Sequence, residues 1–320
     1  MNLRAEQTTT RRTLIKGAAV AVAGLAAWEV GAAQPALAAA QQAPSAARAG
    51  RMKYGVSATQ SRFADNYPRQ VRQLSAECCY VYWPAGANTV WSNGPSSAPG
   101  HHDIWLQTKE TTKAAYKAML RTFPAHRKGR VFLHYFNEPE NNVEAGDFTL
   151  KQWQDRTDAL YEAIDEANLP YVVKSVELMY WTMQCHLKGN FGPKGARRVD
   201  NFLRPGVRHV GWSCYAEKKV KNGHEVASID PVIMPRTISA FMRKRDLPWS
   251  AAATGWAIDT QFLRDKQSIR NRANWLKTAA PNLAAAGSKH FMWFDIPWSN
   301  GDYQIANDRA LLRVWNSLAA

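Results

Sequence analysis

The chain contains few cysteines, and they show no metal-binding spacing. Only four occur in 320 residues, and no Cys/His spacing matches a zinc site. Cys78 and Cys79 are neighbours in an apolar segment and point to opposite faces of a strand, which argues against a bond between them. Cys185 and Cys214 are compatible either with a disulfide bridge or with two buried free thiols.

Other absences exclude further classes of protein. No glycine-rich phosphate fingerprint follows the first predicted strand, because Gly55-Val56-Ser57 lacks the required spacing. No nucleic-acid-binding motif accompanies the basic residues. The apolar run from Gly17 to Trp28 is shorter than the roughly 20 residues of a membrane span, so an uncleaved membrane anchor is the weaker alternative to a cleaved signal. The motifs therefore indicate neither a cofactor, nor a bound metal, nor a nucleic-acid partner.

Acidic residues are fewer than basic ones. The chain has 26 Asp and Glu against 41 Lys and Arg, which gives a formal net charge of +15. A basic protein outside the cell meets anionic partners such as acidic polysaccharides. The alternative is that the charged residues simply form a well-solvated surface.

The N-terminal segment reads as an export signal and not as part of the fold. Arg11 and Arg12 precede the apolar stretch Gly17 to Trp28, and Ala36-Leu37-Ala38 supplies a small-residue cleavage site. This pattern is typical of the twin-arginine pathway. We expect residues 1–40 to be the signal, 41–51 a flexible lead-in, and 52–320 one domain. The mature protein is then secreted or held in the cell envelope and meets the membrane only during export.

The remaining chain predicts an α/β fold, a single (β/α)8 TIM barrel, with an open doubly wound sheet as the alternative. Eight strands are expected near Lys53–Ala58, Cys78–Trp83, Asp103–Thr108, Val131–Phe136, Tyr171–Leu178, His209–Tyr215, Trp249–Thr254 and His290–Asp295. Helices are expected near Phe63–Leu74, Thr111–Phe123, Leu150–Ala167, Ala196–Phe202, Asp230–Arg245 and Arg270–Ala286.

The most informative stretch is the apolar run that begins at Val131 and ends in Asn137-Glu138-Pro139. It places a carboxylic acid at the C-terminal end of a strand, where a barrel enzyme keeps its chemistry. Hydrolysis of a glycosidic bond needs a carboxyl group that protonates the leaving oxygen. The run resembles the fourth strand of clan A glycoside hydrolases, and this resemblance implies that Glu138 is the acid/base residue.

The resemblance extends along most of residues 52–318. Glu138-Pro139-Glu140, Gly146-Asp147-Phe148-Thr149 and Gln152-Trp153 are similar to a run in bacterial proteins related to family 26 glycoside hydrolases, the mannanase-like group. Trp293-Phe294-Asp295 resembles the eighth strand of that group. Two positions depart from its pattern. Ala253 stands where the resemblance implies the nucleophilic glutamate, and Ser213 stands where it implies an aspartate.

A methyl group cannot attack an anomeric carbon, so another carboxylate would have to serve. Glu217, Glu177 and Asp295 are the candidates, and Glu217 is preferred as the base that activates water. Glu217 also fits a simpler role as a surface partner of Lys218 and Lys219. Asp295 is expected to frame the site.

Several other residues are expected to bind the sugar. Among the tryptophans at predicted strand ends, which include Trp83 and Trp293, we predict Trp256 and Trp298 as stacking platforms. Asn137 and Tyr215 are predicted to contact substrate. His134 shares the inward face with Glu138, where it either tunes that acid or fills the barrel. The sequence thus predicts an exported protein that hydrolyses or binds a polysaccharide, which is anionic if the basic charge recognises it. The alternative is a non-catalytic carbohydrate-binding or cell-envelope protein.

Overall fold

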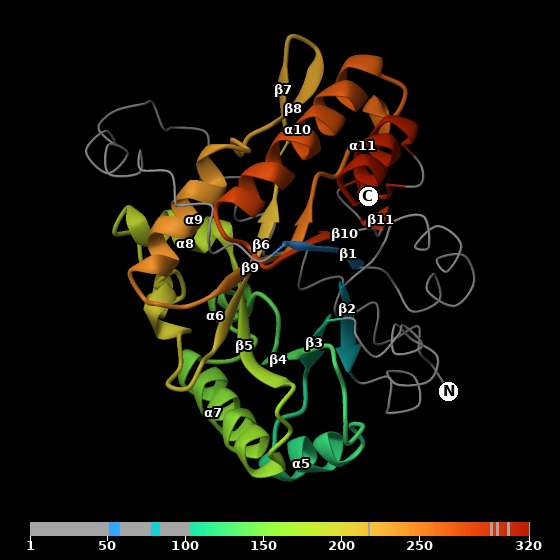
Figure 1. Cartoon of the computed structure of the whole chain (residues 1–320). Helices are drawn as coiled ribbons and strands as arrows, with labels where there is room; N and C mark the ends of the chain where they lie inside the picture. The colour runs from blue at the N-terminus through green and yellow to red at the C-terminus, as the bar shows by residue number, and fades with distance from the viewer. Residues whose placement is uncertain are drawn as a thin grey trace, which may run out of the picture.

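The structure is a computed structural model that describes residues 51–57, 78–83, 103–216, 218–294, 297–298, 301–305 and 308–319. Eight parallel strands pair in the closed order β1-β10-β9-β6-β5-β4-β3-β2 (Figure 1). The barrel strands are β1 (Lys53–Ser57), β2 (Cys78–Trp83), β3 (Asp103–Thr108), β4 (Val131–Tyr135), β5 (Val172–Met179), β6 (His209–Tyr215), β9 (Trp249–Gly255) and β10 (His290–Phe294). The α/β class and the parallel sheet agree with the sequence prediction, whereas the predicted helix Phe63–Leu74 lies outside the described residues.

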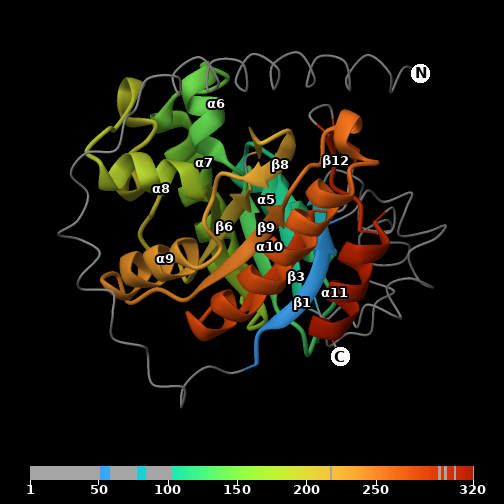
Figure 2. The ribbon, with the colours of Figure 1, turned by 90° about the horizontal axis from the view of Figure 1, so that it is seen from above.

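Helices cover the outside of this sheet. They are α5 (Lys113–Arg121), α6 (Pro139–Ala145), α7 (Leu150–Ala167), α8 (Tyr180–Leu187), α9 (Ile233–Arg243), α10 (Lys266–Ala285) and α11 (Arg309–Ala319). Helix α5 packs against α7, and α10 packs against α11; the second pair lies beside β1 (Figure 2). Within the described parts of the chain, no helix has the length and apolar character needed to cross a bilayer.

Three short 3-10 turns and two small antiparallel hairpins complete the described structure. The turns are Pro193–Gly195, Val199–Asn201 and Thr260–Phe262; the hairpin strands are β7 (Lys218–Lys221) with β8 (His224–Ala227), and β11 (Pro297–Trp298) with β12 (Gly301–Asp302). The prediction of a helix over Ala196–Phe202 is wrong, because the helix after β5 is α8, which begins directly at Tyr180. Helix α8 shows little separation of polar and apolar faces, so the 3.6-residue pattern that reveals other helices is missing.

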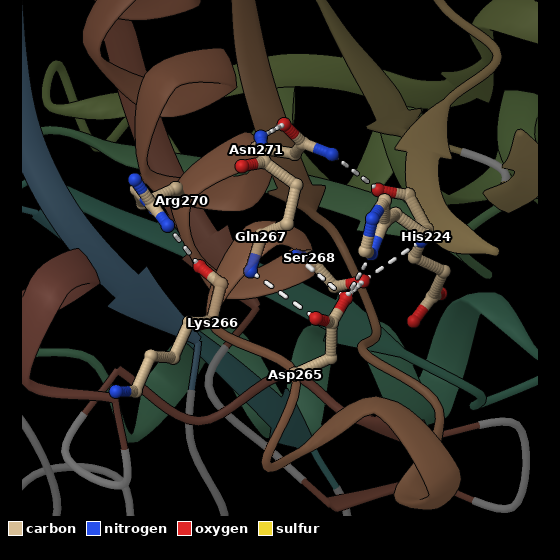
Figure 3. A network of polar contacts seen from close by, with 8 residues as sticks. His224, Asp265, Lys266, Gln267, Ser268, Arg270 and Asn271 are labelled. Atoms are coloured by element: carbon tan, nitrogen blue, oxygen red, sulfur yellow. Dashed lines mark hydrogen bonds and ion pairs between the residues drawn. The ribbon is translucent and has the colours of Figure 1, made fainter. Parts of the chain in front are cut away.

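Local capping fixes where two long helices begin. The amide of Gln152 donates to the Thr149 hydroxyl at 3.1 Å and the Gln152 side chain accepts from the Thr149 amide at 2.8 Å, which forms a capping box at α7. At α10, Asp265 accepts from the Ser268 amide at 2.9 Å and contacts His224 at 2.9 Å (Figure 3). Hydrogen bonds at the start of α10 therefore hold the β7–β8 hairpin against the barrel.

The interior of the barrel is filled in layers. Trp105 stacks on Phe132 with ring centroids 5.0 Å apart, and this pair packs with Ala252 and Met292. A Cβ on Gly211 would lie 2.6 Å from the Trp105 ring, so only glycine fits at that point of β6. The centre of the barrel is therefore a packed core.

A chain of polar side chains closes the floor, the N-terminal end of the strands. Ser250 contacts His209 at 2.8 Å and His290 at 2.7 Å. His290 contacts Asp103 at 2.8 Å, and Lys53 donates to Asp103 at 2.9 Å. Burial alone would raise the pKa of Asp103, but the hydrogen bonds from His290 and from the Arg130 amide lower that pKa well below its usual range.

Two of the four cysteines have side chains within the described residues. Cys185 is a half-buried free thiol and Cys214 a buried one, so the alternative of a bridge between them is not realised in the structure. The side chains of Cys78 and Cys79 lie outside the described residues.

Candidate active site

Glu138 lies at the C-terminal end of β4, where the backbone makes a sharp turn into α6. The residues Phe136 (φ 54°) and Glu138 (φ 50°) both take the left-handed conformation, which costs of order 1–3 kcal/mol for each non-glycine residue. Asn137 between them forms a bridge with Glu177 of β5, and the Glu138 amide donates to the Glu177 carbonyl at 3.1 Å. Pro139 then begins α6. Such strain is held where the surrounding structure fixes it, and it clusters at functional sites.

The carboxyl group of Glu138 is removed from water, although the residue as a whole is partly exposed. Its Oε1 atom is buried and has no hydrogen-bond partner among the described residues. Burial raises the pKa of Glu138, while a hydrogen bond from the Ser213 hydroxyl acts in the opposite direction. A raised pKa is what a general acid needs in order to keep its proton near neutral pH.

A second carboxyl group lies in the adjacent strand. Glu177 is 0 % exposed; its Oε1 accepts a hydrogen bond from Ser213 Oγ at 2.8 Å, and its Oε2 is 3.5 Å from His134 Nε2. Burial lowers the pKa of His134 to about 3, so this imidazole is neutral at neutral pH. His134 thus fills the barrel beside Glu177, and the expectation that it tunes Glu138 stays a prediction.

A third carboxyl group, Glu140, was not assigned a role in the sequence analysis. It is 1 % exposed, and its Oε1 accepts from the Met179 amide at 2.7 Å. Burial raises the pKa of Glu140 to about 8, and the charge of Glu138 adds to this effect. The Glu-Pro-Glu spacing is the sequence signal for it, since the proline starts helix α6 with one carboxyl directly before it and the other in its first turn.

The two positions at which the sequence departs from the pattern that it resembles lie side by side. Ser213 of β6 pairs with Ala253 of β9, and β9 shifts its register against both of its neighbours between Ser250 and Thr254. An irregularity of this kind re-aims side chains and is common beside active sites. Ala253 lies beside Ser213 and is 4 % exposed. Its methyl group cannot act as a nucleophile.

Aromatic rings cover the neighbouring part of the mouth. A Cβ on Gly255 would lie 2.7 Å from the Tyr303 ring, which shows how closely that ring approaches β9. Tyr303 also packs against Tyr215 and Phe294, at centroid distances of 5.9 and 5.1 Å. Tyr215 thus lies at the mouth as expected, but within an aromatic cluster that the sequence analysis did not anticipate.

The other predicted site residues divide into two groups. Trp256 is 1 % exposed and Trp293 is 0 % exposed, so neither ring offers a free face. The prediction of Trp256 as a stacking platform is therefore wrong. The remaining predictions concern side chains outside the described residues: Glu217, Asp295, Trp298 and Trp83. Lys218, which the sequence suggests as a partner of Glu217, lies 3.2 Å from Asp259.

One basic side chain among the described residues lies over the ring of Phe136, at the end of β4. Lys109 directly follows β3, and its Nζ is 5.0 Å from the centroid of the Phe136 ring. Partial burial of the ammonium group lowers the pKa of Lys109, and no carboxylate among the described residues pairs with it. Within the same residues, no group of three His, Cys, Asp or Glu side chains is arranged to hold a metal ion.

Solved structures that are similar to this fold include clan A glycoside hydrolases. Neither a protein family nor a curated protein sequence matches the chain. The chain is similar to the exo-beta-1,4-mannosidase Op5Man5 from Opitutaceae bacterium strain TAV5, with 12% identity and a TM-score of 0.57 over 86% of this chain and 60% of that one. A GH128 endo-beta-1,3-glucanase from Amycolatopsis mediterranei, in complex with laminaripentaose, shows 15% identity and a TM-score of 0.51 over 83% and 99% of the chains. A double mutant of the Cellulomonas fimi endo-beta-1,4-mannanase shows 10% identity and a TM-score of 0.54, over 84% of this chain and 71% of that one. At these identities the likeness establishes the fold.

Proposed function

We propose that this protein is a glycoside hydrolase-like (β/α)8 barrel that takes a polysaccharide at the C-terminal mouth of its strands, with Glu138 as general acid. The observation that carries the proposal is the carboxyl group of Glu138, which lies at the end of β4 with a raised pKa. The neighbours of this fold act on polysaccharides, and the sequence motif around Glu138 points to the same chemistry. We place the ancestry closest to family 26.

The chemistry assigned to Glu138 is protonation of the glycosidic oxygen as the bond breaks. A retaining reaction would need a second carboxylate about 5 to 5.5 Å away as nucleophile, and Ala253 lacks one. An inverting reaction needs a base that activates water, for which the sequence favours Glu217. The side chains of Glu140 and Glu177 are buried, at 1 % and 0 % exposed.

A second candidate function is carbohydrate binding without hydrolysis. The specific observation in its favour is Ala253, which pairs with Ser213 at the mouth and brings only a methyl group there. A protein that lost its nucleophile and kept the cleft would bind glycan at the cell envelope. Export by the twin-arginine pathway, through the signal in residues 1–40, is part of both proposals.

The glycan is proposed to be anionic. Two features support this: the net charge of +15 and the position of Lys109, which stands near Phe136 without a carboxylate partner among the described residues. A uronic acid or sulfate group at the mouth would complete that ion pair. Binding should then weaken as salt is added.

The test is turnover on a panel of neutral and acidic glycans and aryl glycosides by the wild type and by Glu138→Gln. If the protein hydrolyses any of them, Glu138→Gln should lower kcat by at least about 100-fold, because general acid catalysis contributes that much or more. Glu225→Gln is the matched control, since Glu225 is a buried glutamate whose pKa is also raised, but it lies on β8, where it accepts a hydrogen bond from the Asp259 amide. An active wild type whose Glu138→Gln variant turns over at a comparable rate would remove Glu138 from the mechanism.

A further inference from the structure

Exposed basic side chains gather on the β7–β8 hairpin and at the start of α10. Two of them, Lys219 and Lys221, belong to β7, and two others, Lys266 and Arg270, belong to α10. The hairpin follows the C-terminal end of β6 and projects beyond the barrel strands (Figure 1). Helix α10 follows the C-terminal end of β9. Both elements therefore belong to the end of the barrel at which Glu138 lies.

The basic residues of the hairpin adjoin those of the helix. His224 of β8 lies 2.9 Å from Asp265, which caps α10 (Figure 3). Lys221 is the cross-strand partner of His224, and paired residues of an antiparallel ladder point to the same face. Lys219 shares this face, because side chains alternate along a strand. The face of the hairpin that meets the start of α10 thus carries both lysines.

The carboxylates next to these lysines and to the start of α10 already have other contacts or are buried. Asp259 lies 3.2 Å from Lys218. Asp265 accepts hydrogen bonds from the first amides of α10 in addition to its contact with His224. Glu225 is buried. Among the described residues, no carboxylate forms an ion pair with any of the four exposed basic side chains Lys219, Lys221, Lys266 and Arg270.

This arrangement opposes the stability of the free protein. Lys266 and Arg270 are four residues apart on one helix, where like charges repel. Lys266 also lies at the start of α10, where the helix macrodipole favours acidic residues, and the first turn of α10 contains none. Lys219 and Lys221 are about 7 Å apart along one face of β7. Negative charges placed between the members of each pair would remove the repulsion.

We propose that the face formed by Lys219, Lys221, Lys266 and Arg270, here called the hairpin–helix face, binds a linear acidic polysaccharide outside the catalytic cleft. The proposal rests on the function proposed above, because it gives the anionic glycan a second binding surface at the same end of the barrel. A small anion neutralises one cation, whereas a polymer with a carboxylate on each sugar contacts several at once. After the first contact, the others form at a high effective concentration.

The measurement is the Kd of fluorescein-labelled polygalacturonate, from fluorescence anisotropy at several salt concentrations. Lys219→Gln/Lys221→Gln and Lys266→Gln/Arg270→Gln should each weaken binding about 5- to 10-fold at low salt, since each removes two exposed ion pairs with the polymer. The dependence of Kd on salt should become shallower in both variants. Methyl-esterified polygalacturonate, which lacks the charges, should bind weakly to every protein.

The matched control is Arg243→Gln/Lys244→Gln. These residues are also exposed, but they lie at the C-terminal end of α9, which leads to the opposite end of the barrel. The control removes the same charge and should leave the Kd as it is in the wild type. An equal loss in the control would show that only net charge matters, and it would overturn the proposal.

Further results would also overturn it. These are an absence of binding by the wild type at low salt, an unchanged Kd in both hairpin–helix variants, and a larger effect of these variants on binding to phosphatidylglycerol vesicles than to the polymer. Loss of binding in Lys109→Gln alone would contradict the hairpin–helix face and leave the anionic mouth. The assay needs no turnover, so a wild type that cleaves no glycan but shows the expected losses would contradict only the proposed hydrolysis.

Discussion

The buried imidazole of His134 makes the stability of the protein depend on pH in a way that can be calculated. The side chain is 0 % exposed, and burial lowers its pKa from 6.5 to about 3. The unfolded chain therefore binds a proton at this residue below pH 6.5, while the folded protein binds it only near pH 3. Stability is lost as the pH falls through the unfolded value, and the full loss is reached near the folded value.

Between pH 7 and pH 5, this difference amounts to about 2 kcal/mol of unfolding free energy from His134 alone. The assay is urea unfolding at both pH values for the wild type and for His134→Gln, which cannot titrate. The pH dependence of the variant should be smaller than that of the wild type by about 2 kcal/mol. Because His209 and His290 are also buried with lowered pKa values, only this difference between proteins isolates His134.

The control is His126→Gln, which removes an exposed histidine and should leave the pH dependence as it is in the wild type. An identical pH dependence in the wild type and in His134→Gln, with both proteins folded at pH 7, would refute the argument that His134 is held neutral by burial.

Three other changes have defined outcomes. Gly211→Ala should lower the unfolding free energy by about 1–3 kcal/mol in urea melts, since its Cβ would lie 2.6 Å from the Trp105 ring; an unchanged melt would contradict the tight contact. Ala253→Glu should create or raise hydrolysis of an activated aryl glycoside if the site is a degenerate retaining one, and azide should do so in the wild type; silence from both would favour the binding protein. Replacing Arg11 and Arg12 with lysines should keep the precursor in the cytoplasm in a fractionation assay, and undiminished secretion would exclude the twin-arginine assignment.

The strands and the position of Glu138 could be predicted because their signals are local. An apolar run that ends in Asn137-Glu138-Pro139 marks both the end of β4 and the start of α6, and the structure places Glu138 at that junction. The helix expected near Leu150–Ala167 is likewise α7, with the same bounds. Such features depend on a few neighbouring residues, so the chain alone specifies them.

The partners of Glu138 could not be predicted, because they come together only through the closure of the sheet. Ser213 reaches Glu177 across two adjacent strands, and its pairing with Ala253 depends on an irregularity in β9 that no periodicity reveals. The burial of Trp256 could not be predicted either. A tryptophan that follows a strand has the same local sequence whether it stacks on a sugar or packs in the interior. The structure shows it 1 % exposed.

The two ends of the barrel differ in the hydrogen bonding of particular buried side chains, and this difference supports the function proposed for the mouth. At the floor, the side chains from Lys53 to His209 form an unbroken chain in which each has a hydrogen-bond partner. Toward the mouth, Glu138 Oε1, Glu140 Oε2 and both polar atoms of the Gln107 amide are buried without partners among the described residues. Each such atom costs about 1–3 kcal/mol, so a fold selected for stability alone would pair them as the floor does. A carboxyl that gives its proton to a ligand has to leave a hydrogen-bonding position open, and the mouth of this barrel is where those positions gather.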